Sequence, residues 1–204
     1  MHAEPVTFDG VVAHVVGQVL TRPGTVRVVV DGHPSTRPEV LADALVEPLR
    51  AAGREVARVR TQDFLRQPSL RLERGRRDPD SLLDAWVDAS GLDREVLRSA
   101  VHDGRYLPSL RDPGSGRSTR AAYVEAPAGT VVVLDGSLLL GLGLDADLTV
   151  HLALRPQTET RRTPLDEAWT LAAYDRYRRE VAPERRADVV VRVDHADRPA
   201  LVVR

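Results

Sequence analysis

The sequence predicts an α/β fold in which helices cover both faces of a mainly parallel β-sheet. Short runs rich in valine and leucine, which indicate buried strands, recur along the 204 residues. They alternate with segments whose apolar residues recur at helical spacing. Such alternation is typical of parallel sheets joined by helical crossovers. We therefore expect a single α/β domain over residues 1–204, without internal repeats.

The first elements follow from spacing and from proline. An amphipathic helix is expected over residues 8–20, within an N-terminal segment 1–24, because apolar side chains recur there every three or four residues. A buried strand is expected at 26–30, where β-branched residues are consecutive. The next helix is expected at 39–52, with a kink at Pro48, whose ring disrupts the helical hydrogen bonds.

The remaining elements continue the same alternation. Residues 65–80 and 104–120 lack periodicity, so both are predicted to be loops, the second a flexible surface loop. Further strands are expected at 55–60, 131–134, 148–154, 189–193 and 201–203, and further helices at 82–89, 93–101 and 164–180.

Composition excludes several classes of function. The net charge of −1 gives no general attraction for nucleic acid or an anionic membrane. The chain has no cysteine, which removes disulfides and thiolate metal sites, and no lysine, which removes the usual phosphate-binding ammonium. Met1 is not followed by a signal-peptide pattern, and apolar runs are too short to span a bilayer. Cytoplasmic localisation is the expectation.

The step from the first strand to the next helix is where nucleotide-binding α/β proteins place their phosphate loop. Such a loop needs glycines, a lysine for the terminal phosphates and a Ser or Thr for Mg²⁺. The candidates for phosphate binding here are Gly32, Ser35, Thr36 and Arg37.

An ordered set of short motifs resembles the bacterial uridine kinase family over about residues 25–203. The motifs are Val28-Val29-Val30-Asp31-Gly32 with Leu41-Ala42, Phe64, Arg74-Gly75-Arg76, Pro79-Asp80, Asp84-Ala85-Trp86-Val87-Asp88, Val131-Val132-Val133-Leu134-Asp135-Gly136, and Ala187-Asp188-Val189-Val190-Val191 with Asp194 and Asp197 after it. The resemblance implies a three-layer P-loop sandwich, ATP and Mg²⁺ as cofactors of an active member, and a nucleoside or other small-molecule substrate.

The sequence departs from the family pattern within the loop. Alignment through Gly32 and Leu41-Ala42 places Arg37 at the last loop glycine, Pro38 at the lysine and Glu39 at the Mg²⁺-binding hydroxyl. Arg37 has a Cβ and does not freely adopt positive φ. Pro38 supplies neither cation nor N–H, and Glu39 carries a negative charge.

Thr36 to Glu39 also match a helix capping box. In that arrangement the Thr36 hydroxyl accepts from the Glu39 N–H, and the Glu39 carboxylate accepts from the Thr36 N–H. The sequence thus predicts a helix N-terminus closed by its own side chains.

The second departure concerns the acceptor site. With Phe64 as the anchor, the position of the family's catalytic base is Gln62, which cannot take a proton. Asp63 is the alternative base if the kinase is active, although an extended strand would turn it to the opposite side. Asp135 would be the Mg²⁺ residue of an active kinase, and its structural alternative is a turn carboxylate that caps Ser137.

The third departure is a lid-like region, residues 155–180, that is shorter than in the family. Arg155, Arg161 and Arg162 are candidates for phosphate contacts, or else solvated surface arginines. Trp86 and Trp169 lie on expected helices and are predicted to be core residues rather than a platform for a base.

Three functions remain open from the sequence. The preferred hypothesis is a catalytically degenerate uridine kinase-like protein without cofactor, which binds a nucleoside, a phosphorylated small molecule or a protein partner. The second is an active ATP- and Mg²⁺-dependent kinase in which Arg37 replaces the lysine. The third is a scaffolding subunit whose arginine-rich loops contact another protein. No nucleic acid or membrane partner is expected.

Overall fold

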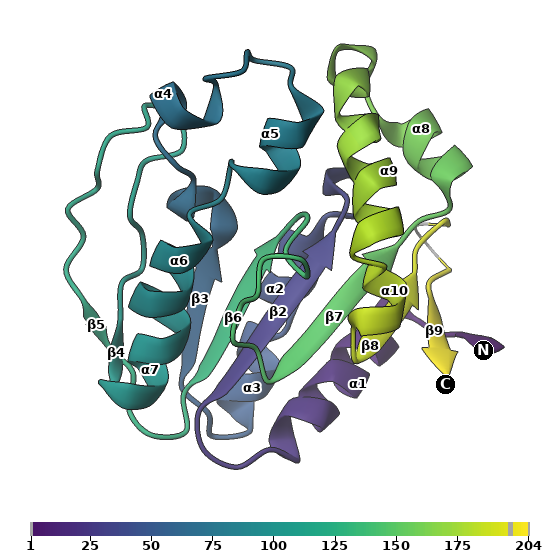
Figure 1. Ribbon diagram of the computed structural model, residues 1–204. Helices are drawn as coiled ribbons and strands as arrows, with labels where there is room; N and C mark the ends of the chain where they lie inside the picture. Colours follow the sequence, from purple (N-terminus) through teal and green to yellow (C-terminus); the bar gives the residue numbers. More distant parts are fainter. Residues whose placement is uncertain (1, 196–197, 204) are drawn as a thin grey trace.

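The computed structural model describes residues 2–195 and 198–203, so Asp197 lies outside the described residues. Its centre is a seven-stranded sheet in the order β1-β9-β8-β7-β2-β6-β3 (Figure 1). The strands from β8 to β3 run parallel, whereas β9 is antiparallel to β8 and to β1. The predicted α/β class with a mainly parallel sheet is confirmed.

The strands of this sheet are β1 His2–Pro5, β2 Val26–Gly32, β3 Val56–Arg60, β6 Val131–Gly136, β7 Leu148–Ala153, β8 Val189–Arg192 and β9 Ala200–Val203. Strands β4 Arg105–Tyr106 and β5 Val124–Glu125 form a separate pair. The helices are α1 Phe8–Leu20, α2 Pro38–Ala44, α3 Val46–Ala51, α4 Pro68–Arg71, α5 Pro79–Asp84, α6 Ala89–Leu92, α7 Ser99–His102, α8 Pro156–Arg162, α9 Leu171–Glu180 and α10 Pro183–Arg186. The 3₁₀ turns are η1 Pro34–Thr36, η2 Thr61–Phe64 and η4 Leu165–Thr170, whereas η3 Asp93–Arg98 is a wider π-helical segment.

Both faces of the central strands are buried, which explains their unbroken valine runs. On one face, Val28 and Val30 of β2 belong to a core that includes residues of α1, α2 and α3. On the other face, Val29 packs in a second core with residues of α6, η3 and α7. Helices α9 and α10 cover the β7–β8 part of the second face (Figure 1). The result is a three-layer sandwich.

Two predicted helices are divided or shortened in the structure. The helix expected at 39–52 is interrupted at Leu45, between α2 and α3. Pro48 causes this, because its ring would clash with the carbonyl of Ala44, four residues earlier. The helix expected at 82–89 was misplaced: α5 is Pro79–Asp84, and the Asp78 side chain caps it by accepting from the Ser81 N–H at 2.6 Å.

Several short elements were not predicted. They include β1, α4, α8 and α10, each only four to seven residues long. The segment 104–120, expected to be a flexible loop, contains β4 and an antiparallel bridge between Arg111 and Ser118. Among the described helices, none combines the length and the apolar character that a bilayer span needs.

Phe64 should be a main support of the second core, because its side chain is fully buried. We expect Phe64→Ala to lower the free energy of unfolding by about 3–5 kcal/mol, since it deletes a large buried ring. Urea denaturation followed by circular dichroism measures this. Leu70→Ala, at a side chain that is 56% exposed, is the control and should change stability by less than about 0.5 kcal/mol. Equal effects of the two substitutions would contradict the assignment.

Candidate functional site

The candidate site lies at the carboxyl ends of β2, β3, β6 and β7, where the connecting loops diverge. Ligands of parallel α/β proteins bind at this edge. Gly32 ends β2, and its neighbours leave no room for a side chain there: an added Cβ would lie 2.5 Å from the Thr36 hydroxyl and 3.0 Å from the Leu152 Cβ. The loop after β2 is therefore packed directly against β7.

The loop after β2 forms the turn η1, whose backbone donors are bonded within the loop. The Ser35 N–H donates to His33 Nδ1 at 3.1 Å, and the Thr36 N–H donates to the His33 carbonyl at 2.8 Å. The Arg37 N–H donates to the Pro34 carbonyl at 3.0 Å. Three consecutive N–H groups thus have protein acceptors at the place where a phosphate loop would present them to a ligand.

The predicted capping box is wrong. The Thr36 hydroxyl donates to the His33 carbonyl at 2.7 Å, and the N-cap residue of α2 is Arg37, which makes no side-chain cap. Arg37 has φ 57° and ψ 60°, so it does adopt the left-handed conformation despite its Cβ. Its guanidinium is exposed and lies 3.5 Å from the Glu39 carboxylate. The loop therefore keeps the backbone turn of a glycine with an arginine side chain.

A cavity of about 490 Å³, which we call the strand-end cavity, opens beside this loop. Its walls are Pro34, Pro38, Glu39, Arg60, Thr61, Gln62, Leu65, Leu82, Trp86, Val87, Asp135, Gly136, Ser137, Leu138 and Tyr174. The cavity thus brings together the Asp135 and Gln62 positions singled out in the sequence with the substituted Pro38 and Glu39.

Gln62 lines the strand-end cavity, whereas Asp63 does not. The two lie in η2, where the Asp63 carbonyl accepts the N–H groups of Leu110 and Arg111 at 3.0 and 2.9 Å. Burial raises the pKa of the Asp63 carboxyl. The half-buried Asp63 is therefore not part of the cavity wall.

Asp135 is held by an arginine. Its Oδ1 lies 2.6 Å from Arg58 Nη1, and Arg58 Nε also donates to Asp43 at 2.8 Å. Burial raises the pKa of the Asp135 carboxyl; Arg58 opposes this, while nearby Glu39 raises the pKa further. The expected cap of Ser137 is replaced by this ion pair. Among residues 2–195 and 198–203, no cluster of three or more metal-binding side chains occurs.

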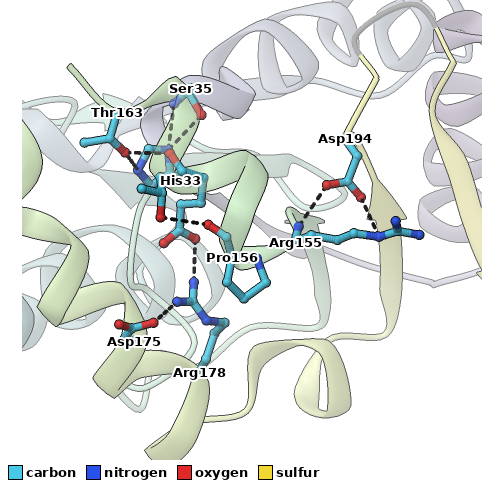
Figure 2. A network of polar contacts seen from close by, with 10 residues as sticks. His33, Ser35, Arg155, Pro156, Thr163, Asp175, Arg178 and Asp194 are labelled. Atoms are coloured by element: carbon cyan, nitrogen blue, oxygen red, sulfur yellow. Dashed lines mark hydrogen bonds and ion pairs between the residues drawn. The ribbon is translucent and has the colours of Figure 1, made fainter. Parts of the chain in front are cut away.

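Two of the three candidate lid arginines, Arg155 and Arg162, contact Asp194. Arg155 donates its N–H to Asp194 at 2.9 Å, and its guanidinium lies 3.7 Å from the same carboxylate (Figure 2). Arg162 donates to the carbonyls of Val193 and Asp194. Arg161 is exposed. Ser35, Thr36, Arg37 and Arg162 line a separate, smaller cavity of about 190 Å³ beside α1. Four of the predicted phosphate-binding residues thus share this smaller cavity, and none of these four lines the strand-end cavity.

Trp86 differs from its predicted role in the core. It is half-buried, forms a wall of the strand-end cavity, and its ring centroid lies 5.9 Å from that of Trp169. The Arg71 guanidinium carbon lies 5.4 Å from the Trp86 ring centroid, on its face. Trp86 Nε1 is buried and has no hydrogen-bond partner among the described residues.

A buried network around Asp31 was missed in the sequence. Asp31 Oδ2 lies 2.7 Å from His151 Nδ1 and accepts from the Tyr177 hydroxyl at 3.0 Å, while Oδ1 accepts from the Leu139 N–H at 2.9 Å. Burial and the Asp31 charge raise the pKa of the Tyr177 phenol, which therefore remains a donor. The indication of this network is the register of β2 and β7, which places Asp31 opposite His151. Sequence spacing of the histidines could not reveal it.

His33 links the loop to the segment after β7, as Figure 2 shows. Its Nε2 lies 3.3 Å from the Thr163 hydroxyl, and that hydroxyl donates to the Glu159 carbonyl at 2.8 Å. The Glu159 carboxylate accepts from Arg178 of α9 at 2.6 Å. Burial, aided by Arg178, lowers the pKa of His33 to about 4, so its ring is neutral at pH 7. These contacts join the loop, α8 and α9.

The neutral state of His33 predicts a dependence of stability on pH. The folded-state pKa lies below the unfolded value near 6.5, so this contribution is present above pH 6.5 and is lost as pH falls towards 4. We expect the fall in unfolding free energy between pH 7 and pH 4.5 to be smaller in His33→Gln by roughly 1–2 kcal/mol, allowing for solvent screening. Urea titrations at both pH values measure it. The matched control is His14→Gln, at an exposed position of α1. If the unfolding free energy of His33→Gln falls between the two pH values as much as that of the natural chain, the assignment is refuted.

Comparison with known proteins identifies the fold. No protein-family model matches the sequence, and no curated protein matches it. Solved structures do match. A protein from Bacillus stearothermophilus described as a possible uridine kinase has a TM-score of 0.70 at 18% identity, over 88% of this chain and 96% of that chain.

Two further solved structures agree. A Silicibacter protein provisionally described as a fructose transport system kinase has a TM-score of 0.64 at 21% identity, over 88% of this chain and 98% of that one. A D-glycerate 3-kinase from Cryptococcus neoformans var. grubii has a TM-score of 0.52 at 16% identity, over 85% and 80%. The chain therefore has the P-loop kinase-like fold implied by its resemblance to uridine kinases.

Proposed function

We propose that this chain is a catalytically degenerate protein of uridine kinase-like fold, which binds a nucleoside or phosphorylated small molecule without transferring phosphate from ATP. The observation that carries the proposal is the closed loop after β2. Its N–H groups at Ser35, Thr36 and Arg37 already have acceptors inside the protein. A triphosphate would have to break these hydrogen bonds before it could use the same donors.

The residues of the loop do not fit ATP and Mg²⁺. A phosphate loop supplies consecutive free N–H groups, a lysine and a metal-binding hydroxyl. Here Pro34 and Pro38 have no N–H, the chain has no lysine, and Glu39 brings a negative charge to the hydroxyl position. The Arg37 guanidinium is the cation that the loop supplies, and it is exposed to solvent beside the Glu39 carboxylate. These features support binding without nucleotide-dependent chemistry.

The closed loop predicts that ATP with Mg²⁺ does not bind at micromolar concentrations. Isothermal titration calorimetry should give no heat of binding to the natural chain. The triple substitution Arg37→Gly, Pro38→Lys, Glu39→Ser should bring the dissociation constant for ATP to 100 µM or below, on the order of a tenfold gain or more, since it restores a glycine, a cation and a hydroxyl. Micromolar binding by the natural chain would contradict the proposal.

The strand-end cavity supports a ligand with hydroxyl groups and a planar ring. Trp86 Nε1 is a buried donor without a partner among the described residues, and it calls for a carbonyl or ring-nitrogen acceptor. Gln62 can both donate and accept, and Arg60 adds a cation at the same wall. A nucleoside provides each complementary group. A nucleoside monophosphate would place its phosphate near Arg60.

A second candidate is an active kinase with a remodelled loop, in which Arg37 replaces the lysine, Asp135 holds Mg²⁺ and Asp63 is the base. The observation that favours it is the position of Asp135 on the cavity wall at the end of β6. The absence of Asp63 from that wall counts against it.

Nucleoside binding should quench or shift the fluorescence of the two neighbouring tryptophans. We expect saturable binding of at least one member of a panel of uridine, cytidine, adenosine, guanosine and their monophosphates. Gln62→Ala should weaken it about three- to tenfold, the value of one hydrogen bond to the ligand. Asp63→Ala, one residue away but off the wall, is the matched control and should bind normally.

The same panel incubated with ATP and Mg²⁺ separates the two candidates. The degenerate protein gives no phosphorylated product. Turnover that disappears in Asp135→Ala would favour the active kinase instead. If none of the eight compounds binds, the assignment of the strand-end cavity to nucleosides is wrong.

A further inference from the structure

The geometry points to a second ligand site: the cavity beneath α8 and α9 binds a small organic cation with planar N–H donors, such as an aromatic amidinium. This cavity, which we call the α9 cavity, has a volume of about 260 Å³. Its walls come from the ends of β2 and β7 and from α8, α9 and α10. It is distinct from the strand-end cavity, although Leu138 and Tyr174 line both.

The central observation is an incompletely bonded carboxylate. Glu159 lines the α9 cavity, and its side chain is only 6% exposed. Its Oε2 accepts from Arg178 at 2.6 Å, but its buried Oε1 has no hydrogen-bond partner among the described residues. Burial raises the pKa of this carboxyl against the opposing effect of Arg178. A buried acceptor without a donor is costly, so a ligand N–H at this atom would be strongly favoured.

Two other groups in the cavity, Asp31 and His33, are already bonded within the protein. Both oxygens of Asp31 accept hydrogen bonds, from Leu139, His151 and Tyr177. The neutral His33 ring is bonded at both nitrogens, to Ser35 and Thr163. The site therefore directs a donor to Glu159 rather than to these residues.

The charges around the cavity favour a cation over an anion. Arg178 is shared between Glu159 and Asp175, with both of which it forms ion pairs. Glu184 pairs with Arg192 at 3.3 Å. The remaining lining arginine, Arg185, is exposed at the rim. Among the described lining residues, Arg178 is thus already paired with two carboxylates and Arg185 lies at the rim, so an anion has no uncompensated cation deep in the cavity, whereas a cation has the Glu159 oxygen as its partner.

The walls favour a flat, compact ligand. Tyr174, Tyr177 and His33 contribute rings, and the His33 and Tyr174 centroids lie 4.4 Å apart. Leu152 and Leu154 complete an apolar surface. Aromatic faces attract organic cations, and apolar walls favour a ligand with a small hydrocarbon body. An amidinium on a single ring combines these features.

Three probes of the same shape and different charge test this inference. Benzamidine is a cation, benzamide is neutral and benzoate is an anion. By ligand-observed NMR and calorimetry at pH 7.5, we expect benzamidine to bind with a dissociation constant at or below the millimolar range. Benzamide should bind at least about tenfold more weakly, and benzoate should not bind. Absence of benzamidine binding, or equal binding of benzoate, overturns the inference.

Variants locate the binding. Glu159→Gln should weaken benzamidine at least tenfold, because the amide cannot supply the charged acceptor. Leu154→Phe should abolish binding by filling the cavity. Because this variant keeps the ion pair between Glu159 and Arg178, loss of binding in both variants could not be explained by disruption of that pair. Glu167→Gln, an exposed acid in η4, is the control. Circular dichroism and urea denaturation verify that each variant is folded. Unchanged affinity in either cavity variant would place the probe elsewhere and refute the site.

This inference does not depend on the proposed nucleoside function, because the two tests use different cavities and ligands. Gln62→Ala should leave benzamidine binding unchanged, and Glu159→Gln should leave nucleoside binding unchanged. If nucleosides fail to bind while benzamidine binds and responds to Glu159→Gln, the proposed function fails and the α9 cavity stands. The reverse pattern rejects the α9 cavity alone.

Discussion

The hydrogen bonds of His33 are the constraint on which the candidate site depends. Its Nδ1 accepts the Ser35 N–H and its carbonyl accepts the Thr36 N–H, so one residue closes the loop after β2. Its Nε2 meets Thr163 at the end of α8. Because the pKa of the ring is low, the ring is neutral at pH 7. It therefore has one acceptor nitrogen, which the Ser35 contact requires, and one donor nitrogen, which the Thr163 contact requires. The loop conformation and the position of α8 are thereby linked through a single imidazole.

Much of the fold could be predicted because it depends on long apolar patterns. The valine runs of β2 and β6 and the helical spacing of α1 indicate elements that are buried on one or both faces. Short elements were missed because they have too few residues for a period to emerge. The prediction of α5 was misplaced because the start of this helix is set by the Asp78 cap and by Pro79 at its first position, more than by apolar spacing.

The site was predicted less completely, because its geometry depends on local competition between hydrogen bonds. Thr36 fits a capping box by sequence, in which its hydroxyl would accept from the Glu39 N–H, but the helix begins one residue later and the hydroxyl donates to the His33 carbonyl within the turn before it. Arg37 takes the left-handed conformation because the turn ends with its N–H on the Pro34 carbonyl, which outweighs the intrinsic preference of a residue with a Cβ. Asp63 is absent from the cavity wall, as an extended strand would have required, but the reason differs, because β3 ends at Arg60 and Asp63 lies in the turn η2.

The edge of the sheet contains three buried carboxylates, and each has a partner from the protein. Asp31 is bonded by His151 and Tyr177, Asp135 is paired with Arg58, and Glu159 is paired with Arg178. Buried charges are tolerated when such partners are present. In a nucleotide-binding site, cations at this edge would instead remain available for phosphates. The internal pairing of Arg58 and Arg178 therefore points in the same direction as the closed loop. Trp86 Nε1 on the wall of the strand-end cavity and Glu159 Oε1 on the wall of the α9 cavity are buried and have no hydrogen-bond partner among the described residues, so a small ligand has most to gain at these two atoms.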